Sequence, residues 1–468
     1  MIAITKSIAT ALILPLAAIM IAMAQTSGGS NPTDKYLWLE DVWGGRSMSW
    51  VKAENARTAK ILEADPRFAE LEKTALTILE APDRLALPDI NHQDVLNTWK
   101  DNAHPLGLLR RTSLSDYLSP TPQWQTLLDY DALANKENQR WVPKERVCLQ
   151  PENELCLIAL SAGGEDAVTY REFNVNTAQF VENGFVLPKS KQTPAWQDKD
   201  TLLVSRDWGP GTMTKSGYPF VVKQWKRGEP LDAAQEIYRG SASDELPTAV
   251  AVSYDGDGNQ AILIDRGVTF FEHEFALLSD GTVHRLALPR KVQISDDFLV
   301  RGQFILTLNE DWTPSGQSST FAQGSVVALN LQALKTDPQR PKPTLVFAPT
   351  GREFPQATSA TKDHLLLTTL ENVQGRAYLC DPGANGGAWT RKRLNLPDNL
   401  SVRIESANSS SNRFFLQVEG FLTPNALWLG DSASGDLKEA KSTPPKFDAS
   451  GITVEQLQAT SKDGTQIP

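Results

Sequence analysis

Metal-binding residue types are scarce in this chain of 468 residues, which has three cysteines and five histidines. No CxxC pair and no Cys/His cluster has the spacing of zinc ligands, and no glycine pattern of the type G-x-x-x-x-G-K occurs. We therefore expect no metal and no other cofactor.

Basic residues form no stripe, and 46 Lys and Arg against 56 Asp and Glu give a net charge of −10. Nucleic acid is not an expected partner, because its phosphates would be repelled.

The few cysteines leave two alternatives open. Cys148 and Cys156 flank the turn residues 151–154, so two strands joined by that turn would place their thiols opposite each other. Either these two form one bridge, with Cys380 left over, or all three are separate buried thiols.

Long apolar runs are absent after the first two dozen residues. Lys6 precedes an apolar stretch from Ile8 to Met23, and small residues surround Ala24 in the pattern of a signal-peptide cleavage site. We expect residues 1–24 to be a signal peptide and the protein to be exported, to the periplasm or the medium. The alternative is an uncleaved anchor, for which the run is short against the ~20 apolar residues of a membrane span. No stable membrane insertion is expected after cleavage.

Helical periodicity is concentrated in residues 25–94. Apolar residues recur along one face from Trp50 to Leu62, with Ser47 or Ser49 as the expected cap. A second helix is expected to begin at Asp65-Pro66, because proline is favoured at the first helical position.

Short apolar runs separated by Gly, Asp, Asn or Pro turns replace that pattern from residue 95 to residue 445. They fall into seven groups, the first from Trp99 to Leu128, at an average of roughly 49 residues, near the ~40–50 of propeller blades. Separate β-sandwiches of about 100 residues each would require visible linkers, and none occurs. We predict an all-β fold, a seven-bladed β-propeller over residues 95–445.

The last segment, residues 446–468, follows a Pro444-Pro445 linker. Residues 452–460 alternate like a strand, and residues 461–465 form a turn signal. The sequence stops at Pro468, where a returning strand is expected, and a lone strand is marginally stable at best. We therefore predict an interrupted hairpin.

Six motifs occur in order along the chain. They are Asp34–Asp41 (D-K-Y-L-W-L-E-D), Trp50–Asn55 (W-V-K-A-E-N), Gly211–Pro219, Lys223–Gly228, Phe421–Pro424 and Ser461–Pro468 (S-K-D-G-T-Q-I-P). The ordered set resembles the prolyl oligopeptidase family of serine peptidases. The first motif resembles the family's D-P-Y-x-W-L-E-D start, with Lys35 where proline is usual. The last resembles the S-x-D-G-x-x-I-P hairpin that opens the hydrolase domain.

The resemblance implies a fold and an activity. In that family a seven-bladed propeller caps an α/β-hydrolase domain, and the N-terminal helical segment belongs to the hydrolase half. A Ser/Asp/His triad cleaves peptides, typically after proline, and the propeller admits short peptides while excluding folded proteins. Residues 446–468 are then the start of a truncated hydrolase domain. The expected partners are short peptides in the propeller channel and that missing domain, without which the chain is predicted inactive.

No residue is assigned a catalytic, cofactor-binding or metal-binding role. A nucleophile elbow needs G-x-S-x-G, and the nearest approach, residues 430–434 around Ser432, lacks the closing glycine, so we expect a turn. His273 lies between Glu272 and Glu274, but adjacent strand residues point to opposite faces. We expect His273 to be solvated or locally paired.

Two further features leave function open. Residues 255–259 (D-G-D-G-N) resemble the start of a calcium loop, but Gln260 and Arg266 stand where glycine and glutamate are required, so we expect a hairpin turn. The alternative function is a stand-alone propeller that binds peptide or protein without catalysis. Its difficulty is the two amphipathic helices, whose apolar faces would lack a partner.

Overall fold

The structure, a computed structural model, describes residues 34–41, 43–383 and 387–468. The predicted signal peptide, residues 1–24, lies outside these residues. The described residues divide into a helical unit that ends at Arg84 and a β unit that starts at Leu85. Among the described helices, none combines the length and apolar character that a membrane crossing requires.

The helical unit contains η1 (Leu37–Leu39), α1 (Gly45–Leu62) and α2 (Phe68–Leu79). The Trp38 and Trp50 rings pack edge to face at 6.3 Å between centroids, which links the first two family-like motifs. Both predicted helices form, but their expected starts are wrong. Gly44 is the N-cap of α1, and Ser47 lies in its first turn with its hydroxyl donating to the Gly44 carbonyl. Asp65 precedes α2 in a turn and accepts from the Arg67 backbone N–H.

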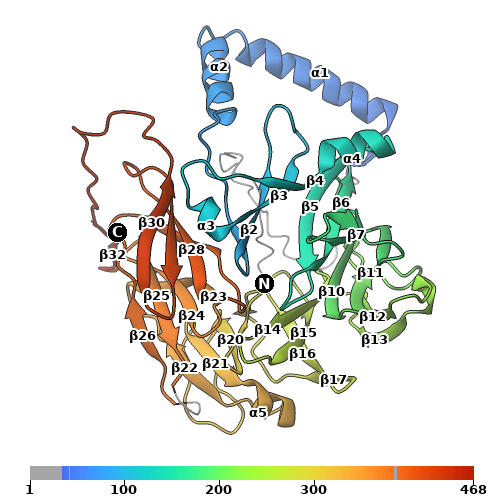
Figure 1. Ribbon diagram of the computed structural model, residues 1–468, viewed down its shortest axis with the longest axis vertical. Coiled ribbons are helices and arrows are strands. Elements are labelled where there is room, and N and C mark those ends of the chain that lie inside the picture. The colour runs from blue at the N-terminus through green and yellow to red at the C-terminus, as the bar shows by residue number, and fades with distance from the viewer. Residues whose placement is uncertain (1–33, 42, 384–386) are drawn as a thin grey trace. The chain divides into compact units, whose positions relative to one another are not determined.

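The β unit is a propeller of seven antiparallel sheets, each built from consecutive strands (Figure 1). Blades 1 to 3 contain β1 (Asp89–Asn91), β2 (Asp94–Trp99), β3 (Leu108–Ser113) and β4 (Gln125–Asp129); β5 (Trp141–Cys148), β6 (Leu155–Ala162), β7 (Val168–Asn174), β8 (Gln179–Phe180) and β9 (Val186–Ser190); β10 (Gln192–Asp198), β11 (Thr201–Arg206), β12 (Val221–Lys226) and β13 (Gln235–Arg239). The predicted number of blades is confirmed. Blade 1, however, begins at Asp89, before the predicted boundary at residue 95, because the short strand β1 pairs with β2.

The remaining blades follow in chain order. Blades 4 to 7 contain β14 (Thr248–Tyr254), β15 (Gln260–Gly267), β16 (His273–Ser279) and β17 (Thr282–Arg285); β18 (Val292–Gln293), β19 (Leu299–Val300), β20 (Gln303–Leu308), β21 (Val326–Asn330) and β22 (Pro343–Phe347); β23 (Glu353–Ala360), β24 (Leu365–Glu371), β25 (Gln374–Asp381) and β26 (Thr390–Arg393); β27 (Ser401–Ser406), β28 (Arg413–Glu419), β29 (Ala426–Asp431) and β30 (Asp436–Ser442). Short helices connect strands: α3 (Leu114–Tyr117), α4 (Tyr130–Glu137), η2 (Leu231–Ala233) and α5 (Leu331–Thr336).

Hydrophobic cores fill the seams between neighbouring blades, one cluster in each seam. Blade 7 shows how: Phe414 and Leu416 on β28 pack toward blade 6, whereas Phe415 packs toward blade 1. Alternate side chains of a strand point to opposite faces, so a strand buried on both faces is apolar throughout. This explains the continuous apolar runs of the sequence.

Strand direction defines the two ends of the ring. In a four-stranded antiparallel blade the first strand begins, and the fourth ends, at the same end. The chain therefore joins the ring at Asp89 and leaves it at Ser442 at one end, which we call the linker end. The first strands β5, β10 and β14 contact their neighbours in turn, which places the first strands next to the axis.

The final hairpin differs from its prediction. Only Ala459 and Thr460 form a strand, β31 (Ala459–Thr460), and they pair with β32 (Gln466–Ile467). The predicted long strand from residue 452 is wrong, because none of the described strands pairs with residues 452–458. These residues instead run beside blade 6, where the Gln456 amide donates to the carbonyl of Asn372 at 2.6 Å.

Candidate functional site

The linker end carries the connections between second and third strands. In blade 3 this connection includes Gly211–Pro219, and in blade 7 it includes Phe421–Pro424. The blade 3 loop is held by its own contacts: Met213 and Pro219 form an isolated bridge, and the Trp208 indole donates to the Val221 carbonyl at 3.1 Å. Two of the three propeller motifs that resemble the peptidase family therefore lie at the linker end, whereas Lys223–Gly228 runs along β12 toward the other end.

Exposed aromatic side chains also lie at the linker end. Phe270 and Phe271, between β15 and β16, are 49% and 68% exposed, and Phe421 is 86% exposed. Large exposed aromatic rings lose the benefit of burial unless a partner covers them. The linker end is therefore the candidate interaction face of the propeller.

Beside this face, blade 3 holds an unusual set of cations. Arg206, the last residue of β11, is only 8% exposed, and its guanidinium lies over the Trp208 ring at 5.6 Å. The Lys223 ammonium lies over the same ring at 4.7 Å. Burial lowers the pKa of Arg206 from its ordinary value, and the charge of Asp207 opposes that shift.

His273 is buried and paired, not solvated. Its Nδ1 lies 2.7 Å from an oxygen of Asp265, a residue on the neighbouring strand β15. The flanking carboxylates point away, as expected: Glu274 pairs with Arg266 at 3.0 Å, and Glu272 with Arg290 at 3.3 Å. The sequence alone did not identify Asp265 as the partner of His273, because only the pairing of β15 with β16 brings the two side chains together.

An imidazole held by a carboxylate is two-thirds of a serine triad. The third member is missing, because the His273 Nε2 is buried without a hydrogen-bond partner in the described part of the chain. Ser432, the nearest approach to a nucleophile elbow, lies in the turn between β29 and β30, and its hydroxyl hydrogen-bonds to Asn412 and Thr361. The predicted turn is confirmed.

The calcium-like segment is also the predicted hairpin turn, between β14 and β15. The Asp255 carboxylate accepts from the backbone of Asp257 and Asn259 and from the Gly302 N–H of blade 5 at 2.6 Å. Its oxygens are thus used by N–H donors. Over residues 34–41, 43–383 and 387–468, no group of three or more His, Cys, Asp or Glu is placed to hold a metal ion.

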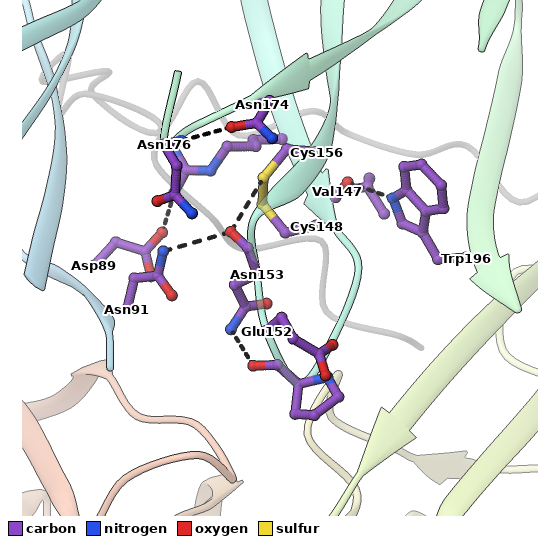
Figure 2. The surroundings of a disulfide bond; sticks show 12 residues. Asp89, Asn91, Val147, Cys148, Glu152, Asn153, Cys156, Asn174, Asn176 and Trp196 are labelled. Carbon is purple, nitrogen blue, oxygen red and sulfur yellow. Dashed lines mark hydrogen bonds and ion pairs between the residues drawn. A yellow bond between two sulfur atoms is a disulfide. The ribbon is translucent and has the colours of Figure 1, made fainter. Parts of the chain in front are cut away.

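At the other end of the ring, Cys148 and Cys156 form a disulfide across β5 and β6 (Figure 2). The structure thus selects the bridge over separate thiols, and Cys380 is free and buried. The loop closed by this bridge reaches blade 1. The Asn91 amide donates to the Asn153 carbonyl at 3.5 Å (Figure 2). The His92 Nε2 lies 3.1 Å from the Glu152 carbonyl.

The chain matches a family model described as the prolyl oligopeptidase N-terminal beta-propeller domain over residues 22–443. The chain belongs to the prolyl oligopeptidase family. It is 39% identical over 454 residues to the uncharacterized peptidase y4nA of Sinorhizobium fredii, covering 95% of this chain and 62% of the relative. A second relative, the uncharacterized peptidase RP174 of Rickettsia prowazekii, is 27% identical over 92% of this chain and 61% of its own length. The chain thus spans about three-fifths of the length of these two relatives.

Solved structures agree with the fold. A post-proline cleaving enzyme from Rickettsia typhi superposes with a TM-score of 0.82 at 25% identity, over 92% of this chain and 63% of that one. Oligopeptidase B from Leishmania major superposes with a TM-score of 0.67 at 14% identity, over 94% and 61%. Both solved chains therefore share the fold of most of this chain.

Proposed function

We propose that this chain is the access-controlling part of an exported serine endopeptidase of the prolyl oligopeptidase family. The family match over residues 22–443 carries the proposal. In this proposal a hydrolase domain packs against the linker end, where the ring receives and releases the chain and where Phe270, Phe271 and Phe421 are exposed. Short peptides reach that domain along the axis of the ring, and folded proteins do not fit.

The proposal assigns no catalysis to the 468 residues themselves. It is supported by the incomplete His273–Asp265 pair and by the turn that contains Ser432. Peptide hydrolysis then needs the serine, aspartate and histidine of the partner domain, acting by acyl transfer.

Two measurements on the purified chain test this function. A chromogenic peptide with proline before the scissile bond should show no turnover, and a fluorophosphonate probe should label no serine. The proline pentapeptide Ala-Ala-Pro-Ala-Ala should bind in a calorimeter, whereas the same sequence displayed on a folded carrier protein should bind far more weakly. Turnover with serine labelling, or equal binding of the folded carrier, would contradict the proposal.

A further inference from the structure

Two arginines of the β unit are almost fully buried, and they differ in their partners. Arg376 and Arg206 are each 8% exposed. Arg376 forms ion pairs with Glu371 and Asp398, both at 2.9 Å. Arg206 hydrogen-bonds within the described residues only to main-chain carbonyl oxygens, those of Asp207 at 3.3 Å and Pro188 at 3.4 Å. A buried guanidinium without a hydrogen-bonded carboxylate is costly, and the charge of Asp207 offsets only part of the desolvation of Arg206.

One guanidinium nitrogen of Arg206 has no acceptor. Its Nη1 is buried and without a hydrogen-bond partner in the part of the chain that the structure describes. Directly across the β10–β11 ladder, Gln192 is paired in register with Arg206. The Gln192 amide nitrogen donates to the carbonyls of Val168 and Pro188, at 2.7 and 2.9 Å, which fixes the amide, yet its Oε1 is also buried and unpartnered. The unmet donor of Arg206 and the unmet acceptor of Gln192 therefore belong to two neighbouring side chains that both bind the Pro188 carbonyl of blade 2.

Positive charge around this position is only partly offset: the charge of Asp207 acts on Arg206, and no carboxylate forms an ion pair with Arg206 or Lys223 in the described residues. Lys223 shares the Trp208 ring with Arg206. Its cross-strand neighbour Glu236 is occupied by Arg239, which donates two hydrogen bonds of 2.8 and 2.6 Å to it. An anion at this point gains from two cations, one of them able to offer a forked guanidinium.

The position is also suited to a ligand that travels along the axis. Gln192 begins β10, an axis-side strand, and Arg206 ends β11, so both lie at the linker end of the ring. Gln192, Arg206, Trp208 and Lys223 together are called the Arg206 site below.

We propose that the Arg206 site binds the C-terminal carboxylate of a peptide. The carboxylate accepts from the Arg206 Nη1 and is attracted by Lys223, while the N–H of the same terminal residue donates to the Gln192 Oε1. The pairing of an unmet donor with an unmet acceptor favours a peptide end, which carries a carboxylate and an N–H on one residue, over a side-chain carboxylate. This inference rests on the proposed function, since it names the peptide end that the propeller recognises.

Calorimetric titration of the full 468-residue chain tests the site with three probes. They are Ala-Ala-Pro-Ala-Ala with a free C-terminus, the same peptide as a C-terminal amide, and Ala-Ala-Pro-Ala-Glu amide. The free acid should bind about tenfold or more tightly than its amide, as expected for a charge-assisted hydrogen bond. Arg206→Gln should remove that preference, because it weakens binding of the free acid about tenfold and binding of the amide much less.

The controls keep the outcomes separable. Lys223→Gln, at a partly exposed position, should reduce the acid preference about two- to threefold without disturbing folding. Arg413→Gln removes an exposed arginine of blade 7 that pairs with Asp431. This variant should change neither the affinity for the free acid nor that for the amide. Equal binding of acid and amide by the unaltered chain would overturn the site while leaving peptide binding intact. If the Glu amide matched the free acid, the assignment to a peptide end would be wrong. Failure of all three peptides to bind would count against the proposed function itself.

Discussion

Two seams of the ring border blade 1, and they are held in different ways. The seam to blade 2 is continuous in sequence and is reinforced by the disulfide-closed loop, whose Asn153 and Glu152 carbonyls meet Asn91 and His92. The seam to blade 7 joins residues more than three hundred positions apart, as the bond from the Ile90 N–H to the Ser406 hydroxyl shows, at a separation of 316. In Figure 1 the first and last blades lie side by side.

The difference shows what closes the ring. Each blade uses its own consecutive strands, so among the described strands none from one end of the chain completes a sheet at the other. The closing seam, between blades 7 and 1, therefore depends on side chains. Tyr117 and Phe415 pack edge to face at 5.6 Å, the Asn408 amide donates to the Ile90 carbonyl at 2.7 Å, and the Lys441 ammonium donates to the Ser119 carbonyl at 2.9 Å.

Removing the aromatic core of the closing seam should have the largest effect. Phe415→Ala leaves a cavity beside Tyr117 and should lower the free energy of unfolding by about 3–5 kcal/mol, measured by urea denaturation. Phe414→Ala is the matched control, because Phe414 is equally buried but packs in the seam between blades 6 and 7. Both should destabilise, but only Phe415→Ala should raise hydrogen exchange in β1. Equal exchange in β1 for both variants would remove the distinction between the seams.

The closing seam should also respond to pH through Glu405, which lies on β27. Burial, mainly, and the nearby charge of Asp89 raise the pKa of Glu405 to about 7 from the ordinary 4.5, against the opposing charge of Arg403. The folded protein thus holds a proton that the unfolded chain releases, so this contribution is complete below about pH 4.5 and is lost as pH rises through 7. The loss is about 3 kcal/mol at most.

Glu405→Gln tests this assignment, because an amide cannot ionise. The variant should be more stable than the parent at pH 8 and should lose the decrease in unfolding free energy between pH 5 and pH 8, a range set by the shift of Glu405. Parallel pH profiles for the two proteins would show that Glu405 is not the group responsible.

Loss of the disulfide beside the seam between blades 1 and 2 should have a smaller effect on stability. Replacing Cys148 and Cys156 together by serine removes a short loop closure and should lower the unfolding free energy by about 2 kcal/mol. A reductant should lower the melting temperature of the parent but not of the double variant, since Cys380 is the free thiol of the described residues. A melting temperature of the parent that ignores the reductant would contradict a stabilising role for the bridge.

The polar contacts of single side chains give the smallest test. Asn408→Ala removes the donor to the Ile90 carbonyl and the acceptor of the Ser410 N–H and hydroxyl, and it should cost about 1.5 kcal/mol. Asn91→Ala removes one longer bond in the seam between blades 1 and 2 and should cost less. Thermal denaturation of the two variants side by side measures the difference. A larger loss for Asn91→Ala would reverse the order assigned to the seams.

Sequence was sufficient for the ring but not for its details. Runs such as Leu365–Leu367 and Phe414–Leu416 predicted buried strands, because both faces of a blade are covered by neighbours. The predicted boundary of blade 1 lies too late in the sequence, because β1 has only three residues and carries no apolar run. The short helix α4 was missed as well, although Asp129 caps it through the Asp131 and Ala132 N–H groups.

The candidate site was less accessible to sequence. Arg206 and Gln192 stand out only once the register places them opposite each other and the hydrogen bonds of Arg206 prove to end on main-chain carbonyls. Asp265 joined His273 for the same reason. Pattern reading finds strands and turns, because these depend on neighbours in the chain, whereas cross-strand partners depend on register and seam packing.

Hydrogen exchange of the unaltered chain tests closure by side chains most directly. The account predicts that amides of β1, including the Ile90 N–H bonded to Ser406, exchange faster than those of the axis-side strands β10 and β14, whose blades are continuous in sequence with both neighbours. Protection of β1 equal to that of β10 and β14 would contradict it, since the closing seam would then be as firmly held as the others.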